Sequence, residues 1–437
     1  MLNARQVESI AREAKFVQRT SKLNGIRFSR LMIFSGGNIS DTSLEELCHE
    51  FKYLFGENLE KQSLNERINE FAVNFFKLLL EEVLARNLKL SGFKDILPNQ
   101  KRIRIKDSTS FQVPEHLKDL YTGSGGVTSK ACLKIQFEYD IKTGEVIELS
   151  VGSFTNSDLN NSYQTAESIE NSDLLIRDLG YISLEFLETI ESKLAYYLNR
   201  IKSNVNIYQQ DKNGCFVPLN LEKIESKMRR SKIKTMGFEV YLGEEKKVKS
   251  RVIIEILPKD VIEEKLRKAK RAAQREGRDL GKDTIGRIGL NIFVTNLSEE
   301  DLPNEMVRDL YRLRWQVELV FKVWKSLAKI DQTKKDVKCE RLECHIYGKL
   351  IWVFLGWGIF WKLTEIIKDK IRWFSFYKMM KNLRTLSQRL ITQSGNISRN
   401  IRMLVKMFIE EVMKKCRLEE KKKSLSSIEI ITQLINI

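Results

Sequence analysis

The chain has 437 residues and a formal net charge of +17 at pH 7, and hydrophobic residues make up 42% of it. This length suggests two to four domains with cores of ordinary size, and the positive excess indicates a polyanionic partner, either nucleic acid or an acidic membrane surface. Only three histidines occur, which argues against catalysis by paired histidines and excludes the His-x-x-Arg element of tyrosine recombinases.

The cysteines and the apolar segments indicate the cellular compartment of the protein. Six cysteines are scattered without a C-x-x-C pair, and their one cluster, Cys339 and Cys344 with His345, lacks the spacing of a common zinc site. No signal peptide is visible, and the apolar stretch 350–361 is too short to span a bilayer, so it is expected to form a buried helix. A large basic chain without a disulfide pattern is expected to be cytoplasmic, with no membrane partner.

Residues 1–95 are predicted to be helical. An amphipathic stretch over 42–55 ends before Gly56, and Ser63 with Glu66 indicates a capping box ahead of an apolar run at helical spacing. Two helices with a short break form either a DNA-binding helix-turn-helix or a plain helical bundle, and the pattern fits both.

After Pro98 the hydrophobic period changes to two, which is typical of strands. Three strands are predicted first, the last two as a hairpin: 102–109, 130–140 and 145–154. A helical stretch near 162–170 leads to a short strand that ends at Asp178, and helical spacing then resumes.

This order of elements suits a ribonuclease H-like α/β core. Such a core needs one more strand, which is predicted at 287–297, and a helix at 310–329 to carry its last acid. The segment 196–284 between them is predicted to be an insertion that begins with strands and ends with a strongly basic helix. Downstream of residue 330 the chain is predicted to be helical and basic.

Four polar residues stand out in the helix predicted at 310–329. Tyr311, Arg314, Glu318 and Lys325 lie at offsets of 0, 3, 7 and 14 residues, which places them within about 60° of arc on one helical face. One acid among basic residues on a largely buried helix suits a site that holds a metal and a polyanion together. The alternative is a solvated stripe in which Arg314 forms an ion pair with Glu318.

Two aspartates follow predicted strands and are candidates for the same site. Asp107 ends the first strand, and Asp178 ends a later one. Side chains at adjacent strand ends of one sheet converge, and two Mg²⁺ ions require shared carboxylate oxygens and few other ligands. Taken singly, Asp107 is also explained as a turn or N-cap residue, and Asp178 as a strand terminator.

The spacing Tyr-x2-Arg-x3-Glu-x6-Lys resembles the YREK signature of DDE transposases of the insertion-sequence-four family, which are cut-and-paste enzymes of bacterial mobile elements. A DST motif at Asp107 and a D-x-G-Tyr motif at Asp178 precede it in the family's order. The resemblance covers about residues 40–365. It implies that Asp107, Asp178 and Glu318 are the catalytic acids and the ligands of two Mg²⁺ ions, for which Mn²⁺ can substitute. It also implies that Tyr311, Arg314 and Lys325 contact DNA.

The resemblance implies four regions. A helical DNA-binding domain is expected at 1–95, and a ribonuclease H-like core at 96–195 and 285–365. A β-rich insertion domain is expected at 196–284, and a helical region for assembly or DNA contacts at 366–437. Its expected partners are the terminal inverted repeats and target DNA, bound by a homodimer on paired ends. The expected location is the bacterial cytoplasm, at the nucleoid when DNA is bound.

Other functions fit the same residues. A ribonuclease H-like nuclease without strand transfer is one, and a non-catalytic DNA-binding repressor is another. Some family members stack a flipped base on a tryptophan of the insertion, which supports a hairpin intermediate. All six tryptophans of this chain follow the insertion, so Phe293, Tyr241 or Tyr208 would have to take that role here.

Overall fold

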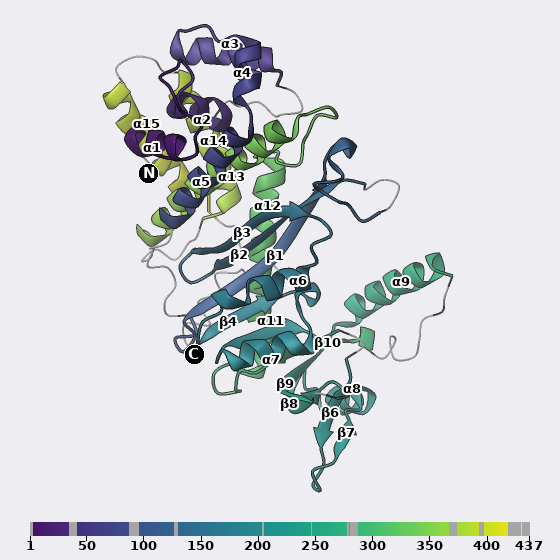
Figure 1. The fold of residues 1–437 in the computed structure, drawn as a ribbon. Helices are drawn as coiled ribbons and strands as arrows, with labels where there is room; N and C mark the ends of the chain where they lie inside the picture. The colour runs from purple at the N-terminus through teal and green to yellow at the C-terminus, as the bar shows by residue number, and fades with distance from the viewer. Residues whose placement is uncertain are drawn as a thin grey trace. The chain divides into compact units, whose positions relative to one another are not determined.

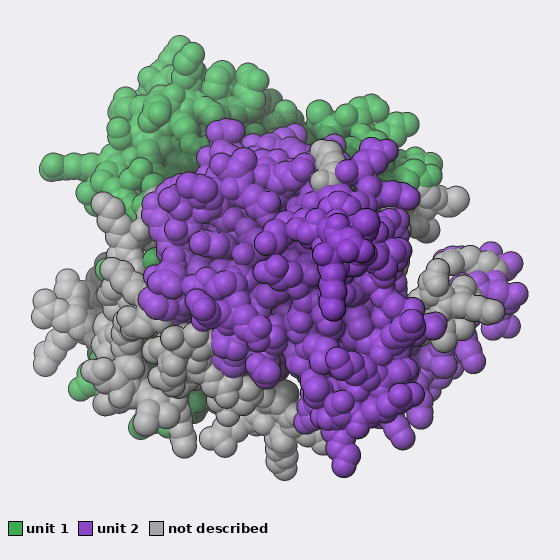
Figure 2. Space-filling view, turned by 90° about the horizontal axis from the view of Figure 1, so that it is seen from below, with its two compact units in different colours: residues 1–93, 108–155, 316–424 green, residues 94–107, 156–315, 425–437 purple. Residues whose placement is uncertain are grey.

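The computed structural model describes residues 3–34, 42–86, 96–125, 130–202, 205–245, 247–277, 279, 287–366, 374–392, 397–417 and 430. The chain is a mixed α/β protein with a large sheet and flanking helices (Figure 1). It forms two compact units (Figure 2). Unit 1 comprises Met1–Phe93, Ser108–Thr155 and Gln316–Ser424, and unit 2 comprises Lys94–Asp107, Asn156–Trp315 and Leu425–Ile437.

Unit 1 is rich in helices. Its N-terminal helices are α1 (Ala4–Glu13), α2 (Gly25–Phe34), α3 (Leu44–Phe55), α4 (Lys61–Arg67) and α5 (Glu70–Arg86), and its later ones are α12 (Gln316–Ser326), α13 (Cys339–Ile366), α14 (Phe376–Thr392) and α15 (Ile397–Lys415). The long helix α13 packs against α5 and α2.

The helix ends of this region confirm one predicted boundary and correct another. Helix α3 ends at Gly56 in the left-handed conformation, where a residue without Cβ is favoured. The capping box expected at Ser63 is wrong, because α4 already begins at Lys61 and Ser63 lies inside it. The box that forms instead joins Ser43 to Glu46 at the start of α3.

The apolar stretch 350–361 lies within α13, as the prediction of a buried helix required. By length and composition alone, Cys339–Thr364 is the one helix among the described residues that is able to cross a membrane. However, 61% of its apolar window is buried inside the protein. A core helix passes the same test, so this helix is only weak evidence for a membrane span.

Unit 1 also holds the predicted hairpin of β2 (Cys132–Asp140) and β3 (Val146–Ser153). Its turn needs a glycine, because Gly144 has φ +76° and a Cβ there would lie 2.3 Å from the Trp361 ring. The indole N–H of Trp357 donates to the Gly144 carbonyl at 2.8 Å. Aromatic rings of β2, α12 and α13 pack into one cluster that anchors α12: Phe137, Tyr139, Phe321, Trp324, Phe354 and Trp357.

Unit 2 is built on the sheet. Its strands are β1 (Arg102–Gln112, which passes into unit 1 after Asp107), β4 (Asp173–Arg177), β5 (Tyr196–Arg200), β6 (Ile207–Gln210), β7 (Phe216–Pro218), β8 (Thr235–Leu242), β9 (Val248–Ile256) and β10 (Leu290–Thr295). They follow the order β1-β4-β5-β10-β9-β8-β6-β7. The first three are parallel, and β10 and the strands beyond it pair antiparallel.

The pairing of the sheet adds detail that the sequence pattern did not give. The neighbour of β4 is β5, and β10, at the strand predicted for 287–297, lies one place further along. The strands β6 to β9 of the predicted insertion join the same sheet through β10. Alternation alone does not fix which strands pair, because every strand here offers an apolar face.

Helices complete unit 2: α6 (Asp158–Gln164), α7 (Leu184–Ser192), α8 (Leu221–Arg230), α9 (Lys259–Arg275) and α11 (Asn304–Arg312). A buried apolar core joins residues from α7, β4 and β5 to those of β8, β9 and β10. The basic helix α9 matches its prediction. Its last nine residues carry five cations and no acid: Arg267, Lys268, Lys270, Arg271 and Arg275.

Candidate active site

The pairing of β1 with β4 places the two candidate aspartates side by side. The strands are parallel, with Arg102 opposite Asp173 and Ile105 opposite Ile176. The same register, continued by two residues, sets Asp107 opposite Asp178. Because side chains alternate between the two faces of a sheet, both carboxylates lie on one face, on strands about 4.8 Å apart.

The local backbone of the two acids differs slightly from the sequence expectation. Strand β1 continues to Gln112, so Asp107 lies within the strand and does not end it. Asp178 directly follows β4 with extended dihedrals and caps a short 3₁₀ turn over Leu179–Tyr181. One of its carboxylate oxygens accepts the backbone N–H of Leu179 at 2.9 Å.

Two residues of the YREK segment contact these aspartates. Nη1 of Arg314 lies 2.8 Å from Oδ2 of Asp107, and the two side chains are 11% and 20% exposed. The hydroxyl of Tyr311 donates to Oδ1 of Asp178 over a long 3.4 Å. Burial, followed by the nearby Asp178 charge, raises the pKa of Tyr311 to about 12, so this phenol stays a neutral donor.

The segment that carries the motif is not one continuous helix. Helix α11 ends at Arg312, a 3₁₀ turn spans Leu313–Trp315, and α12 begins at Gln316. A 3₁₀ turn advances about 120° per residue, against 100° in an α-helix, so the predicted arc of 60° does not apply across the break. Arg314 forms an ion pair with Asp107, a partner that the sequence did not suggest.

The other two residues of the motif belong to unit 1. Glu318 lies in the first turn of α12, where the helix dipole favours a carboxylate. Lys325 lies in the last turn, and its ammonium donates to the Ser110 carbonyl on β1 at 3.2 Å. Thus contacts within unit 2 gather Asp107, Asp178, Tyr311 and Arg314, while Glu318 and Lys325 are fixed by the packing of α12 in unit 1.

The donor set suits a hard divalent cation in its chemistry. Two carboxylates that share one row of a sheet supply the oxygen ligands that Mg²⁺ prefers. Within the described parts of the chain, no three His, Cys, Asp or Glu side chains are gathered closely enough to hold a metal ion by themselves. Asp107 and Asp178 are thus the carboxylates of unit 2 that could hold such an ion, and the Arg314 guanidinium lies beside Asp107.

Sequence reasoning missed the residues behind these aspartates. Arg104, Lys106 and Arg177 are fully buried, although charged residues are almost never fully buried unless they are paired. The signal was present in the stretch Arg102 to Asp107, where every second residue is a cation. That alternation indicates a strand with one charged face.

The aromatic residues named as candidates for base stacking differ in access. Phe293 is 3% exposed and packs against the Tyr311 ring, with centroids 5.3 Å apart, so it has no face free for a base. Tyr208 and Tyr241 lie on the outer strands β6 and β8. The Lys247 ammonium lies 3.5 Å from the Tyr208 ring centroid, and Phe216 packs edge-on against Tyr241.

Comparison with known proteins identifies the class to which this site belongs. The family model described as "Transposase DDE domain" matches residues 98–353. The chain is 35% identical over 381 residues to a transposase for insertion sequence element IS231F from Bacillus thuringiensis subsp. israelensis, with 83% of this chain and 79% of the relative covered. It is 32% identical over 437 residues to the IS231E transposase from B. thuringiensis subsp. finitimus, with 95% and 90% covered.

Two further similarities are more distant. The IS1151 transposase of Clostridium perfringens is 28% identical, with 83% of this chain and 80% of the relative covered. A piggyBac transposase, solved in a synaptic complex with hairpin DNA, gives a TM-score of 0.46 at 9% identity, covering 97% of this chain and 84% of that one.

The chain belongs to the DDE transposase family, in its insertion-sequence-four group with the YREK signature, which confirms the family prediction. It is an enzyme that cleaves and joins DNA in transposition. Members of this family generally use divalent metal ions.

Proposed function

We propose that this transposase binds the terminal inverted repeats of its own element, cleaves the element ends by phosphodiester hydrolysis with two divalent ions, and joins the 3′ ends to target DNA by transesterification. Mg²⁺ is the proposed ion, and Mn²⁺ can substitute. The observation that carries this proposal is the shared register row and shared face of Asp107 and Asp178. When bound, the ions supply Lewis-acid activation of the attacking oxygen and stabilise the leaving oxygen.

The proposed roles follow from the contacts of each side chain. Asp107, Asp178 and Glu318 are assigned as the catalytic acids and metal ligands. Arg314 neutralises Asp107 at 2.8 Å and is free to exchange this carboxylate for a DNA phosphate, because a guanidinium binds both in the same forked geometry. Tyr311 orients Asp178 as a neutral donor. Lys325 is a further phosphate contact.

The domain organisation is proposed along the same lines. The ribonuclease H-like core predicted at 96–195 and 285–365 also includes strand 196–200, and the β-rich insertion predicted at 196–284 begins after that strand. The chain order of three strands, α6, β4, α7 and β5 supports such a core. Since β5 pairs with β4, we draw the start of the insertion after Arg200.

The proposed partners are end DNA, target DNA and a second copy of the chain. The helical domain 1–95 is assigned to DNA binding, and the five cations in the last nine residues of α9 support a further contact with the phosphate backbone. The region 366–437 is assigned to assembly of a homodimer on paired ends. Four exposed apolar residues of α15 support this role: Met403, Val405, Met407 and Ile409. We place the enzyme in the bacterial cytoplasm, at the nucleoid when it is bound to DNA.

The test is an assay with purified full-length protein, labelled element ends and supercoiled target DNA. With Mg²⁺ or Mn²⁺ we expect cut ends and then joined products. With Ca²⁺ alone we expect stable end complexes without cutting, because Ca²⁺ accepts longer bonds and higher coordination. Cutting without joined products would favour the nuclease alternative. Binding without cutting in Mg²⁺ and Mn²⁺ would favour the repressor, and robust cutting in excess chelator would refute the metal-dependent reading.

A further inference from the structure

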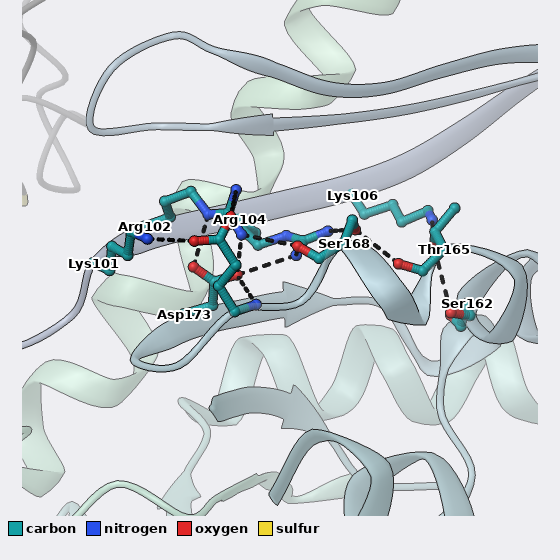
Figure 3. Close-up of polar contacts among 9 residues, drawn as sticks. Lys101, Arg102, Arg104, Lys106, Ser162, Thr165, Ser168 and Asp173 are labelled. Atoms are coloured by element: carbon teal, nitrogen blue, oxygen red, sulfur yellow. Dashed lines mark hydrogen bonds and ion pairs between the residues drawn. The ribbon is translucent and has the colours of Figure 1, made fainter. Parts of the chain in front are cut away.

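A row of buried cations lies behind the two strands that carry the aspartates, and Figure 3 shows two of them, Arg104 and Lys106, pointing toward Ser168 and Thr165. Arg104 and Lys106 on β1 and Arg177 on β4 are each 0% exposed. They occupy the positions that alternate with Asp107 and Asp178, so their side chains point to the opposite face of the sheet. There they meet α6 and the 3₁₀ turn Ala166–Ser168 that follows it.

The part of this row furthest from the aspartates is a structural ion cluster. Arg102 binds both carboxylate oxygens of Asp173, at 2.8 and 2.5 Å, and Arg104 reaches the same carboxylate at 3.2 Å. Both arginines also donate to the Ser168 carbonyl, at 2.9 and 2.8 Å. A buried carboxylate shared by two guanidiniums, with the remaining donors satisfied, accounts for these residues by folding alone.

In the part next to the aspartates, the two cations contact hydroxyl groups of the α6 segment. The Lys106 ammonium donates to Oγ1 of Thr165 at 2.9 Å, and Nη1 of Arg177 donates to Oγ of Ser162 at 3.0 Å. Each cation also lies over an aromatic ring, Lys106 at 5.8 Å from the centroid of Tyr181 and Arg177 at 5.2 Å from that of Phe186.

The register places these two cations immediately behind the acids. Lys106 falls opposite Arg177 in the row just before Asp107 and Asp178. Each cation immediately precedes one of the two acids along the chain, so a contact that fixes the backbone of the cation also fixes the starting point of the acid side chain. This position suggests a role at the aspartate pair.

The contacts around Asp178 show how such a role works. The Ser162 hydroxyl accepts from Arg177, the residue before Asp178, and donates to the Tyr181 carbonyl, three residues after it, at 3.0 Å. The backbone N–H of Arg177 donates to Oδ1 of Asn199 on the next strand at 3.1 Å. The chain on both sides of Asp178 is thus connected to α6. Strand β1 is connected to the same segment by the hydrogen bond from Lys106 to Thr165. The Thr165 hydroxyl in turn donates to the Asn161 carbonyl at 2.8 Å.

We propose that Lys106 and Arg177 are positioning residues that hold the Asp107 and Asp178 carboxylates at the separation a divalent cation needs. They act from the opposite face of the sheet, through the backbone of the row that precedes the acids. This inference rests on the proposed metal-binding role of the two aspartates. We therefore expect the loss of either cation to weaken metal binding. Electrostatics alone predicts the opposite, because removing a nearby positive charge favours the binding of a divalent cation.

The experiment measures Mn²⁺ binding to the full chain without DNA, from the loss of the free-ion EPR signal. Lys106→Met and Arg177→Met should each raise the Mn²⁺ dissociation constant by about tenfold or more, which is the usual effect of removing an outer-shell partner of a metal ligand. The Mg²⁺ concentration for half-maximal cleavage should rise by the same factor, with end-DNA affinity unchanged. Arg177→Lys, which keeps a donor and the charge, should restore part of the Mn²⁺ affinity.

Arg251→Met is the matched control. Arg251 is a buried cation on β9, three strands from β4, and it is held by neutral oxygens of Leu297, Leu302 and Asn304 at 2.9, 2.7 and 3.0 Å. Its loss should lower stability and leave Mn²⁺ affinity unchanged. If Lys106→Met and Arg177→Met behave like this control, or if they bind Mn²⁺ more tightly, the positioning role is wrong.

Two further comparisons keep the test decisive. If a methionine variant does not fold, Thr165→Val and Ser162→Ala remove the hydroxyl partners and should shift Mn²⁺ affinity in the same direction by a smaller factor; no shift would overturn the inference.

Asp107→Asn and Asp178→Asn distinguish failure of the proposed metal ligands from failure of the positioning role. If they leave Mn²⁺ affinity intact, the proposed metal ligands are wrong. If they abolish binding while the cation variants do not weaken it, only the positioning role fails.

Discussion

The two faces of the β1–β4 pair have opposite environments, although they are built from alternate residues of the same short strands. On one face, Arg104, Lys106 and Arg177 are sealed from solvent. On the other, Asp107 is 20% exposed and is neutralised by an arginine that is 11% exposed. Partial access allows the acid face to exchange its counter-charge for a ligand, whereas the sealed face holds its partners permanently. Burial therefore separates the side chains that a ligand can reach from those that it cannot reach.

The largest expected effect comes from the acid face. Asp107→Ala, Asp178→Ala and Glu318→Ala should each reduce end cleavage by about 1,000-fold or more, because several kcal/mol of metal-dependent stabilisation are lost and each 1.36 kcal/mol is tenfold in rate. Binding of end DNA should stay nearly intact. Cleavage and gel-shift assays on the same preparations measure both quantities. An alanine variant that still cuts at a substantial fraction of the wild-type rate would show that its residue is wrongly assigned.

The sealed face should respond in stability. Asp173→Ala leaves the fully buried Arg104 without its carboxylate and should lower the free energy of unfolding by about 3–5 kcal/mol. Asp107→Ala is the matched control on the open face, where the loss should be about 1 kcal/mol or less. Urea unfolding followed by circular dichroism measures both. Equal losses for the two variants would remove the distinction between the faces.

A smaller effect is expected for the cations of the YREK segment. Arg314→Ala and Lys325→Ala should each weaken the complex with cleaved ends by about tenfold, since one charge-assisted hydrogen bond is lost. Each should also flatten the salt dependence of binding by about one unit. Arg312→Ala is the control, because Arg312 pairs locally with Asp309 at 2.9 Å. A lower melting temperature with an unchanged salt slope would mean that Arg314 is only a structural partner of Asp107.

The smallest expected effect concerns Tyr311 at high pH. Its pKa of about 12 in the folded chain exceeds the ordinary value of 10, so above pH 10 the unfolded chain loses this proton first and is stabilised. The free energy of unfolding of the wild type should therefore fall by about 1 kcal/mol relative to that of Tyr311→Phe by pH 11. Below pH 9 the difference between the two proteins should not change with pH. Urea unfolding of both proteins from pH 8 to 11 tests the sign. A difference that stays constant across this range would contradict the buried position of the phenol.

Local sequence patterns predicted the elements of this protein better than their arrangement. Alternation identified β1 and the β2–β3 hairpin, and Gly56 correctly ended α3. The break before α12 was not predictable, because the residues around it contact Asp107 and Asp178 from far away in the sequence. Helical periodicity carries no information about such contacts.

The same limit applies to the site. Motif spacing identified Asp107 and Asp178 as candidates, and the β1–β4 register sets them side by side; their catalytic role remains a prediction. The buried cations were missed because the partners that make their burial tolerable, Thr165 and Ser162, lie 59 and 15 residues away. A charged residue in a strand is read from sequence as exposed unless its distant partner is known.

The alternation of β1 also has a consequence for how copies of the element decay. Loss or gain of one codon between Arg102 and Asp107 keeps the reading frame, yet it would turn every following side chain to the other face of the sheet. A gain would bring Lys106 to the place of Asp107, and a loss would bring Ser108 there. The exposed turn 211–215, between β6 and β7, has no such constraint. Single-codon indels are therefore expected to accumulate at that turn in active copies, and in β1 only in inactive ones.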